Sequence, residues 1–200
     1  MARPKKNSHI TPARERIIDA FWKTLSEKPY SEISVKCISE TAHVNKNTFY
    51  YHFSYIEDLA QTCIHNSLPF EIPKTFIEKG SADIKAVKEI LEKHQKEFRQ
   101  IQLACSPQGS GILSHYVRKQ IIDYWLEAFS LTEQDLTPDE IIMIAFATGG
   151  ITTVLGESYS RNITLDDITH YFDTPFARGA LTSIPKMLMK ASQRSNIYSL

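Results

Sequence analysis

The stretch from Ile33 to Phe53 constrains the fold of this chain most strongly, and it reads ISVKCISETAHVNKNTFYYHF. Apolar residues recur at helical spacing from Val35 to Ala42, and Ser34 stands before them as a residue that can cap free backbone N–H groups. Residues 43–45 leave room only for a turn, and a second short helix is expected from Lys46. Two short helices joined by such a turn form a helix-turn-helix. The stretch therefore predicts this motif.

The second helix of a helix-turn-helix enters the DNA major groove, and the side chains of this one suit that role. The alternative is a helical hairpin whose aromatic residues lie in the core. Three adjacent polar aromatic side chains cannot all point inward from one helix, which favours DNA binding. We assign base readout to the first turn of the second helix and phosphate contact to the charged, hydroxyl and aromatic side chains around it. The expected base contacts are Asn47 and Thr48, and the expected phosphate contacts are Ser34, Lys36, Lys46, Tyr50, Tyr51 and His52.

Residues 14–59 resemble the DNA-binding domain of the TetR family of bacterial transcriptional regulators. The most specific shared run is Thr48-Phe49-Tyr50-Tyr51-His52-Phe53, in register with the upstream helix and with Glu57-Asp58-Leu59 downstream. The chain departs from the family pattern at three positions. His43 and Asn47 stand where the family usually or often has Gly, and Ile56 stands where it usually has a Lys that is thought to touch phosphate.

This resemblance implies an all-α protein with a helix-turn-helix DNA-binding domain over residues 1–66 and a helical effector-binding and dimerisation domain over residues 67–200. It implies a cytoplasmic repressor that binds a palindromic, double-stranded DNA operator as a homodimer and is released by a small-molecule effector. One alternative is a similar regulator that is controlled by a protein partner and has no small-molecule pocket. Another is a helical enzyme or carrier that uses the hairpin only as scaffold.

The distribution of charge agrees with a DNA-facing N-terminus. The chain has no net charge, but residues 1–52 carry nine basic and five acidic residues, a balance of +4, whereas the remainder carries 14 and 18, a balance of −4. Arg3, Lys5 and Lys6 form either an arm that follows the DNA or a solvated tail. Thr11 and Pro12 are expected to begin the first helix as its cap and first residue.

Helical patterns continue to the end of the chain. Ser54-Tyr55-Ile56-Glu57 predicts a capping box for a fourth helix, which ends before Pro69. A stripe of residues spaced three and four apart predicts one long helix over residues 82–105, followed by a helix over 112–129. Two further helices are expected over 165–172 and 175–191, with a frayed tail from Ser192.

Several polar or aromatic side chains on otherwise apolar helical faces are candidates for lining an effector pocket. His94 stands out because aliphatic residues fill most of its stripe, although a histidine that is merely satisfied in the core fits the same pattern. Ordinary core packing is equally the alternative for the aromatic candidates. The candidates are His94, Phe98, Tyr116, Tyr124, Trp125 and Phe146.

Thr137-Pro138-Asp139-Glu140 predicts the start of a helix that runs to about Tyr159 and is apolar on nearly every side. Such a helix needs cover on all faces. Gly149 and Gly150 in its middle favour the close approach of another helix, because each glycine costs roughly 1 kcal/mol relative to Ala. These features suggest a subunit interface, and a central buried helix of a monomer is the alternative.

The sequence gives little sign of chemistry. No nucleophile elbow, zinc-protease motif or C-x-x-C pair occurs, so we expect no enzyme, no metal and no cofactor. Cys37, Cys63 and Cys105 are odd in number and widely spaced, as in structural thiols of a reducing cytoplasm, with a redox-sensing thiol as the alternative. With no run of 18 apolar residues and no apolar stretch after the N-terminal charges, neither a membrane span nor a secretory signal is expected.

Overall fold

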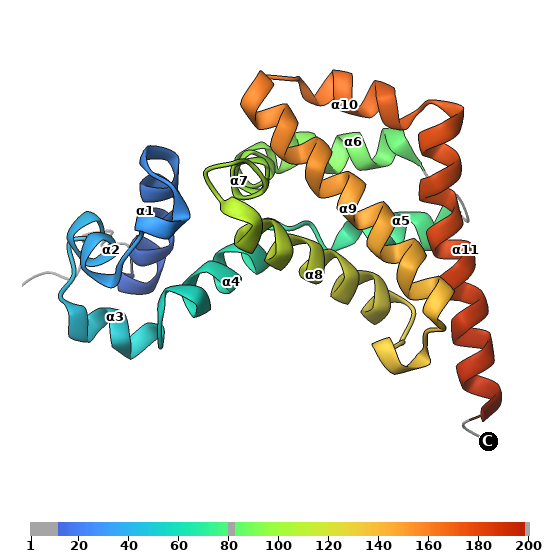
Figure 1. Ribbon diagram of the computed structural model, residues 1–200, viewed down its shortest axis with the longest axis horizontal. Coiled ribbons are helices and arrows are strands. Elements are labelled where there is room, and N and C mark those ends of the chain that lie inside the picture. The colour runs from blue at the N-terminus through green and yellow to red at the C-terminus, as the bar shows by residue number, and fades with distance from the viewer. Residues whose placement is uncertain (1–11, 80–82, 199–200) are drawn as a thin grey trace, which may run out of the picture.

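The computed structural model describes residues 12–79 and 83–198, and every regular element within these ranges is a helix (Figure 1). The all-α prediction is therefore confirmed for the described residues. Two short 3-10 helices, η1 (Tyr30–Glu32) and η2 (Glu133–Asp135), accompany the α-helices. The α-helices are α1 (Ala13–Glu27), α2 (Val35–Thr41), α3 (Lys46–His52), α4 (Ile56–Ser67), α5 (Glu71–Lys79), α6 (Ile84–Lys93), α7 (Gln95–Cys105), α8 (Ser110–Ala128), α9 (Pro138–Arg161), α10 (Leu165–Phe172) and α11 (Pro175–Tyr198).

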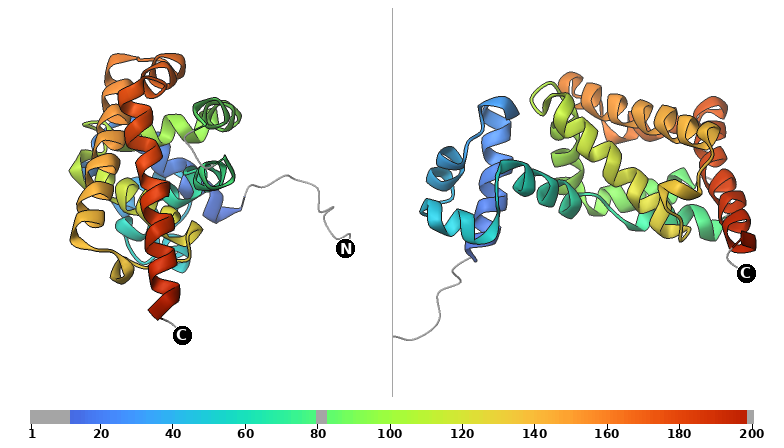
Figure 2. Two further views of the ribbon diagram at one scale, coloured as in Figure 1. Left: turned by 90° about the vertical axis from the view of Figure 1, so that its right-hand side faces the viewer. Right: turned by 60° about the horizontal axis from the view of Figure 1, so that its bottom comes forward.

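The helices form two groups along the long axis of the molecule. Helices α1 to α4, here called the N-terminal unit, lie at one end, and α5 to α11, here called the second bundle, make up the rest (Figure 1). Helix α4 runs from α3 toward the second bundle, and α11 closes the opposite end (Figures 1 and 2). The expected domain boundary after residue 66 lies in the last turn of α4, and it remains a prediction.

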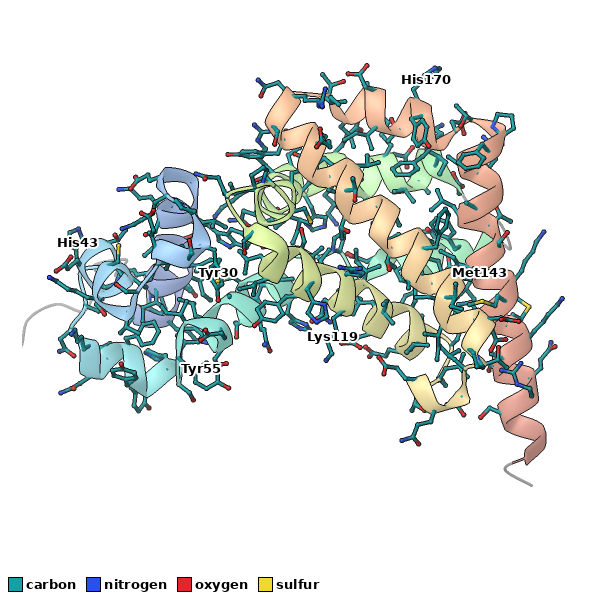
Figure 3. The ribbon with its side chains drawn as sticks, in the orientation of Figure 1. Tyr30, His43, Tyr55, Lys119, Met143 and His170 are labelled. Atoms are coloured by element: carbon teal, nitrogen blue, oxygen red, sulfur yellow. The ribbon has the colours of Figure 1, made fainter. Side chains whose placement is uncertain are left out.

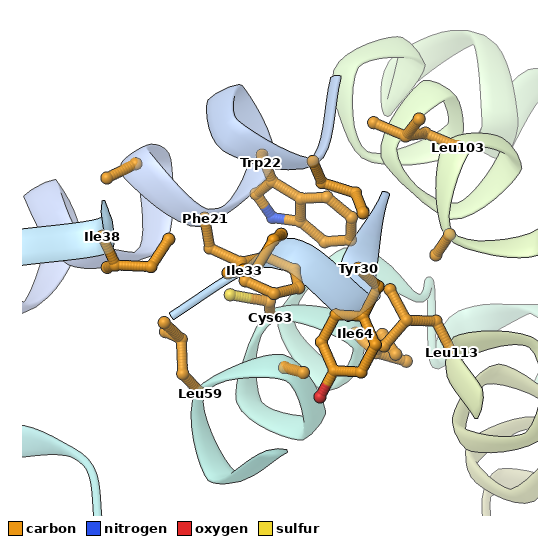
Figure 4. Close-up of a cluster of buried hydrophobic side chains, with 14 of the residues drawn as sticks. Phe21, Trp22, Tyr30, Ile33, Ile38, Leu59, Cys63, Ile64, Leu103 and Leu113 are labelled. Carbon is orange, nitrogen blue, oxygen red and sulfur yellow. The ribbon is translucent and has the colours of Figure 1, made fainter. Parts of the chain in front are cut away.

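One hydrophobic core joins the two groups. Buried side chains of the N-terminal unit, such as Phe21 and Ile64, belong to the same cluster as Leu103 of α7 and Leu113 of α8. The side chain of Tyr30 lies near those of Ile64 and Leu113 (Figure 4), and the Tyr30 backbone N–H donates to the carbonyl oxygen of Gln108 over 2.8 Å. Burial raises the pKa of the Tyr30 hydroxyl, so this group stays neutral. The N-terminal unit is thus packed directly onto the second bundle.

Helices α7 and α9 approach each other closely at Gly156. A methyl group on Gly156 would lie 2.2 Å from the carbonyl oxygen of Cys105, so no larger residue fits. Beside this contact, the buried Gln102 amide donates to the Ser158 hydroxyl over 2.7 Å. A methyl group on Gly149 or Gly150 would meet no atom of this chain within 4 Å. The close approach within the chain is therefore at Gly156, and the surface at the glycine pair is open.

The prediction of one continuous helix over residues 82–105 is wrong, because the helix is interrupted at His94. This residue has backbone angles φ −112° and ψ 43°, and it ends α6 and precedes α7. Its side chain is half-buried, 4.0 Å from the Glu71 carboxylate of α5. The unbroken apolar stripe concealed the break, since two helices that meet at one residue can bury the same pattern.

Three predicted helix ends also differ. Pro12 is the N-cap of α1 and not its first residue, so the helix begins at Ala13, one residue later than expected. Thr11 lies outside the described residues. At the start of α4 there is no Ser54–Glu57 capping box; the Ser54 backbone N–H donates instead to the Asp58 carboxylate over 2.8 Å. The chain does not fray at Ser192, because α11 continues to Tyr198.

The far end of α11 is held by polar contacts to the loop before α9. The Arg194 guanidinium donates to both carboxylate oxygens of Glu140, over 2.8 and 3.1 Å, and to the carbonyl oxygen of Asp135 over 2.9 Å. The Ser195 hydroxyl donates to the Asp135 carboxylate over 2.7 Å. Thr137 and Glu140 form the predicted capping box at the same place. The hydrogen bond from Arg194 lowers the pKa of Glu140, as do the capping contacts.

Replacing Arg194 with Met should lower the free energy of unfolding at neutral pH by about 1–3 kcal/mol, because hydrogen bonds to a charged group are lost. A carboxyl whose pKa is lowered in the folded state stabilises the protein above its ordinary pKa, and this contribution disappears as the pH falls through the lowered value. The difference between wild type and variant in urea unfolding should therefore shrink in acid.

Arg161 is the matched control, since it pairs with Glu157 on the exposed surface of α9, with side chains 72% and 54% exposed. Arg161→Met should change the free energy of unfolding by less than about 0.5 kcal/mol. Equal losses in the two variants would contradict a special role for Arg194.

Candidate DNA-binding surface and second-bundle cavity

The turn between α2 and α3 depends on an unusual backbone conformation at His43. This residue has φ 52°, in the left-handed region that favours glycine. The Arg16 guanidinium of α1 donates to the carbonyl oxygen of His43 over 3.4 Å, which ties the turn to the first helix. His43 lies at the outer end of the N-terminal unit (Figure 3). His43 thus holds a left-handed backbone conformation in the turn although it carries a side chain.

Both helices of the motif begin with a side-chain cap. The Ser34 hydroxyl accepts from the Cys37 backbone N–H over 3.3 Å at the start of α2. The Asn45 side-chain oxygen accepts from the Thr48 backbone N–H over 2.8 Å at the start of α3. The Thr48 hydroxyl also donates to this oxygen over 3.1 Å. Of the expected DNA contacts, Ser34 and Thr48 therefore already make structural hydrogen bonds, and the hydrogen of Thr48 is not free to donate to a base.

The faces of α3 follow from the burial of Phe49, which is completely inaccessible. Asn47 and Tyr51 lie two residues to either side of Phe49, so they share the face directly opposite it. Tyr51 is 84% exposed, Tyr50 is 56% exposed, and Lys46 and Asn47 are exposed as well. An exposed face with one amide and one phenol, flanked by a lysine, can offer hydrogen bonds to base edges and charge to phosphates.

The remaining expected DNA contacts lie beside this face. Lys36 is exposed on α2, with its ammonium 4.0 Å from the Glu40 carboxylate, and this distant surface pair leaves the lysine available to other partners. The half-buried His52 packs its ring edge-on against Tyr51. Tyr55, which the sequence pattern did not single out, is 57% exposed at the start of α4 and is a further candidate (Figure 3). The sequence signal that could have indicated Tyr55 is its position next to Ile56, where the chain departs from the family pattern. The arm with Arg3, Lys5 and Lys6 lies outside the described residues.

The second bundle contains an apolar cavity of ≈ 160 Å³. Side chains from every helix between α4 and α11 line it, together with Leu68 and Pro69 from the connection between α4 and α5. Most of the lining is aliphatic or aromatic. The lining residues of α4, α5 and α6 are Ser67, Ile72, Pro73, Phe76, Ile84, Val87 and Leu91, and those of α7 to α11 are Phe98, Ile101, Ile121, Tyr124, Trp125, Ile151, Leu155, Ile168, Thr169, Phe172 and Leu181.

Three of the six predicted pocket residues line this cavity and three do not. Phe98, Tyr124 and Trp125 belong to the lining. His94 does not, because the break between α6 and α7 places it at the junction beside Glu71. Tyr116 packs against the core shared with the N-terminal unit, and Phe146 is 75% exposed on the outer face of α9. A linear pattern could not find the aliphatic lining, because these residues are ordinary core residues by type.

The cavity touches the end of α4 directly. Tyr124 lines it and donates its hydroxyl to the carbonyl oxygen of His65 in α4 over 3.0 Å, with the His65 ring nitrogen Nδ1 at 3.2 Å. Ser67, the last residue of α4, also lines the cavity and donates to the Gln100 side chain of α7 over 2.8 Å. A change in the shape of the cavity can therefore act on the helix that connects the N-terminal unit to the second bundle.

The cysteines and titratable groups form no obvious chemical centre in the described ranges. Burial raises the pKa of Cys63, and it raises the pKa of Cys105 to about 12, so both thiols stay protonated and unreactive. Cys37 is half-buried, and its interaction with Lys28 raises the pKa of that lysine. Between residues 12 and 198, apart from 80–82, no group of three or more His, Cys, Asp or Glu side chains is arranged to hold a metal ion.

Comparison with known proteins supports the reading of the N-terminal unit. Residues 17–63 match the family described as bacterial regulatory proteins, tetR family. No curated protein matches the chain significantly.

Two solved structures resemble the chain over most of its length. The HlyIIR mutant protein with a segment substituted by alanine is 19% identical, with 87% of this chain and 99% of that chain covered and a TM-score of 0.46. The fatty acid degradation regulator FadR from Bacillus halodurans is 14% identical, with 92% and 96% covered and the same TM-score. Likeness at this level adds nothing about the site.

Proposed function

We propose that this chain, which carries the DNA-binding domain of the tetR family of bacterial transcriptional regulators, is a cytoplasmic repressor that binds a palindromic operator as a homodimer and is released by a small-molecule effector. The observation that carries this proposal is the exposed face of α3, where Asn47 and Tyr51 stand opposite the buried Phe49 on a capped helix. Such a face fits a major groove. Occupying a promoter blocks polymerase without further contacts, which makes repression the simplest mode.

The burial pattern refines the division of labour on α3. Asn47 and Tyr51 project farthest from Phe49, so we assign them to base edges, and Thr48 supports them from the side through its bond to Asn45. Lys46, Tyr50 and His52 remain assigned to phosphates, with Ser34 and Lys36 of α2. We add Tyr55, whose exposed hydroxyl at the start of α4 suits the phosphate that the family contacts through the residue replaced here by Ile56.

The outer face of α9 supports dimerisation. Ile142 is 66% and Phe146 is 75% exposed, and with Gly149 and Gly150 they follow one another at helical spacing. An exposed apolar face of this kind marks an interaction site. The bare surface at the two glycines lets a second copy of α9 approach, with each Phe146 against the partner's glycines across a two-fold axis. A two-fold dimer reads two half-sites about 34–36 Å apart.

The same helix passes a simple test for a membrane span. Among the described residues, α9 alone is long and apolar enough to cross a bilayer by length and composition. A core helix of a soluble protein passes this test too, and α9 carries a capping box and buries one side against α7 and α8. We therefore interpret its exposed side as a dimer face rather than a lipid-facing one.

The cavity supports control by a small molecule rather than by a protein partner. A regulator without a small-molecule pocket needs no cavity that reaches its connecting helix. The cavity here is lined by Ser67 of α4 and by Tyr124, which donates a hydrogen bond to α4. A ligand that favours one arrangement of α4 changes the separation of the two α3 helices, and it weakens DNA binding by its differential affinity for the two arrangements.

The first prediction separates phosphate contact from base readout. Lys46→Ala should weaken binding to operator and to unrelated duplexes alike, and it should lower the slope of log affinity against log salt by about 2 per dimer, about 1 for each subunit. Asn47→Ala should instead cost about 1–3 kcal/mol per half-site on the operator and relax the preference at one base pair per half-site. Fluorescence anisotropy on operator variants at several salt concentrations distinguishes the two, and identical behaviour of both variants would refute the assignment.

The second prediction concerns the dimer. Phe146→Lys should weaken the free energy of dimerisation by about 2–4 kcal/mol, as loss of a central interface side chain does. Operator affinity should fall with it. Tyr171→Lys is the control, because Tyr171 is 46% exposed on α10 away from this face. Sedimentation equilibrium measures both, and a Phe146→Lys variant that dimerises like wild type would exclude the α9 face.

The third prediction concerns the link from the cavity to α4. Tyr124→Phe keeps the ring and removes the two contacts to His65, so amide hydrogen exchange in the last turn of α4 should become about 2–10-fold faster, as expected for a lost hydrogen bond. Tyr116→Phe on the same helix is the control, since Tyr116 does not line the cavity. Equal exchange rates in the two variants would show that the link has no effect on α4.

A further inference from the structure

The lining of the cavity is unusually poor in groups that could recognise a polar ligand. Among the residues that the structure describes, it includes no Asp, Glu, Lys, Arg or His side chain. Its side-chain hydroxyls belong to Ser67, Tyr124 and Thr169, and each donates its hydrogen to a protein acceptor. Ser67 donates to Gln100, Tyr124 to the carbonyl of His65, and Thr169 to the carbonyl of Leu165 over 2.9 Å. The cavity therefore presents hydrocarbon surface and a few hydroxyl oxygens that can only accept.

From this lining we infer that the effector is a small, uncharged and largely apolar molecule, about the size of a single aromatic ring with a short substituent. The inference rests on the proposed function, because it names the class of molecule for the same cavity. Hydrogen-bond donors on the ligand can be matched only by these hydroxyl oxygens, such as that of Thr169.

The size follows from the volume. The cavity of ≈ 160 Å³ is close to the roughly 150 Å³ of engineered apolar cavities that stay dry and bind benzene. The rings of Phe76 and Trp125 pack edge to face, with their centroids 5.2 Å apart. Together with Phe98 and Phe172, they give the cavity aromatic lining against which a ligand ring can pack. A long acyl chain or a multi-ring molecule would have to extend beyond this volume.

The charge follows from the cost of desolvation. An ionised group that enters an apolar cavity loses its hydration, and without a partner of opposite charge or a donor to replace water the cost is several kcal/mol. The described lining supplies neither. Removing apolar ligand surface from water contributes about 25 cal/mol per Å², so an uncharged hydrocarbon gains affinity from the same walls that exclude an ion.

Isothermal titration of the full-length protein, without DNA, with toluene, benzoate and benzylammonium tests this inference, since the three share one ring and differ in charge. Toluene should bind saturably with a negative heat-capacity change, the marker of apolar burial. Benzoate and benzylammonium should bind at least about 100-fold more weakly. If either ion binds within tenfold of toluene, or if toluene does not bind, the inference is overturned.

A matched pair of variants on α6 locates the binding. Val87 lines the cavity, and Val87→Phe should fill it and abolish toluene binding. Ile90 lies on the same helix outside the lining, and Ile90→Phe should bind toluene like wild type. Circular dichroism and operator binding check that both variants are folded. Toluene binding that survives in Val87→Phe would place the ligand elsewhere and overturn the inference, as would equal loss in two folded variants.

Operator affinity measured with and without toluene separates this inference from the proposed function. If toluene binds with the expected selectivity and weakens operator binding, both stand. If toluene binds in the same way and leaves operator affinity unchanged, the class of ligand stands and control of DNA binding by the cavity fails.

Discussion

The packing of the N-terminal unit onto α7 and α8 is the contact on which the rest of the structure depends. Tyr30 is central to it, because its side chain lies near those of Ile64 and Leu113 while its backbone N–H is bonded to Gln108. One buried cluster includes residues from both groups of helices, so the two groups are packed directly together. The orientation of α3 is therefore set by the second bundle through this core as well as by the length and direction of α4.

The position of α4 gives that core its functional meaning. Its middle packs in the shared cluster through Leu59 and Ile64, and its last turn borders the cavity through Ser67. A hydrogen bond from Tyr124 fixes the same turn at His65. One helix thus contacts the DNA-reading motif, the shared core and the cavity, and a ligand-induced change in the cavity has a short route to α3. We propose this route as the basis of regulation.

The sequence predicted best where the cause of structure is local. Ser34 caps α2, and the Thr137–Glu140 capping box starts α9, both as the sequence predicted. These features follow from hydrogen bonds between residues three positions apart. Local patterns misled where they allowed more than one outcome. The apolar stripe through His94 fits either one long helix or two shorter ones, and Ser54-Tyr55-Ile56-Glu57 resembled a capping box although Asp58 makes the contact.

The sequence by itself determined the helical class, the helix-turn-helix and the residue types on α3, because helical periodicity, capping and the burial of Phe49 are readable from neighbours along the chain. Only the tertiary structure decided which core residues enclose a cavity, that the close helix contact within the chain lies at Gly156, and that Phe146 faces outward instead of into a pocket. These outcomes depend on how helices distant in sequence are placed against one another. Spacing along a single helix shows that a face is apolar, but the neighbouring helices determine what covers it.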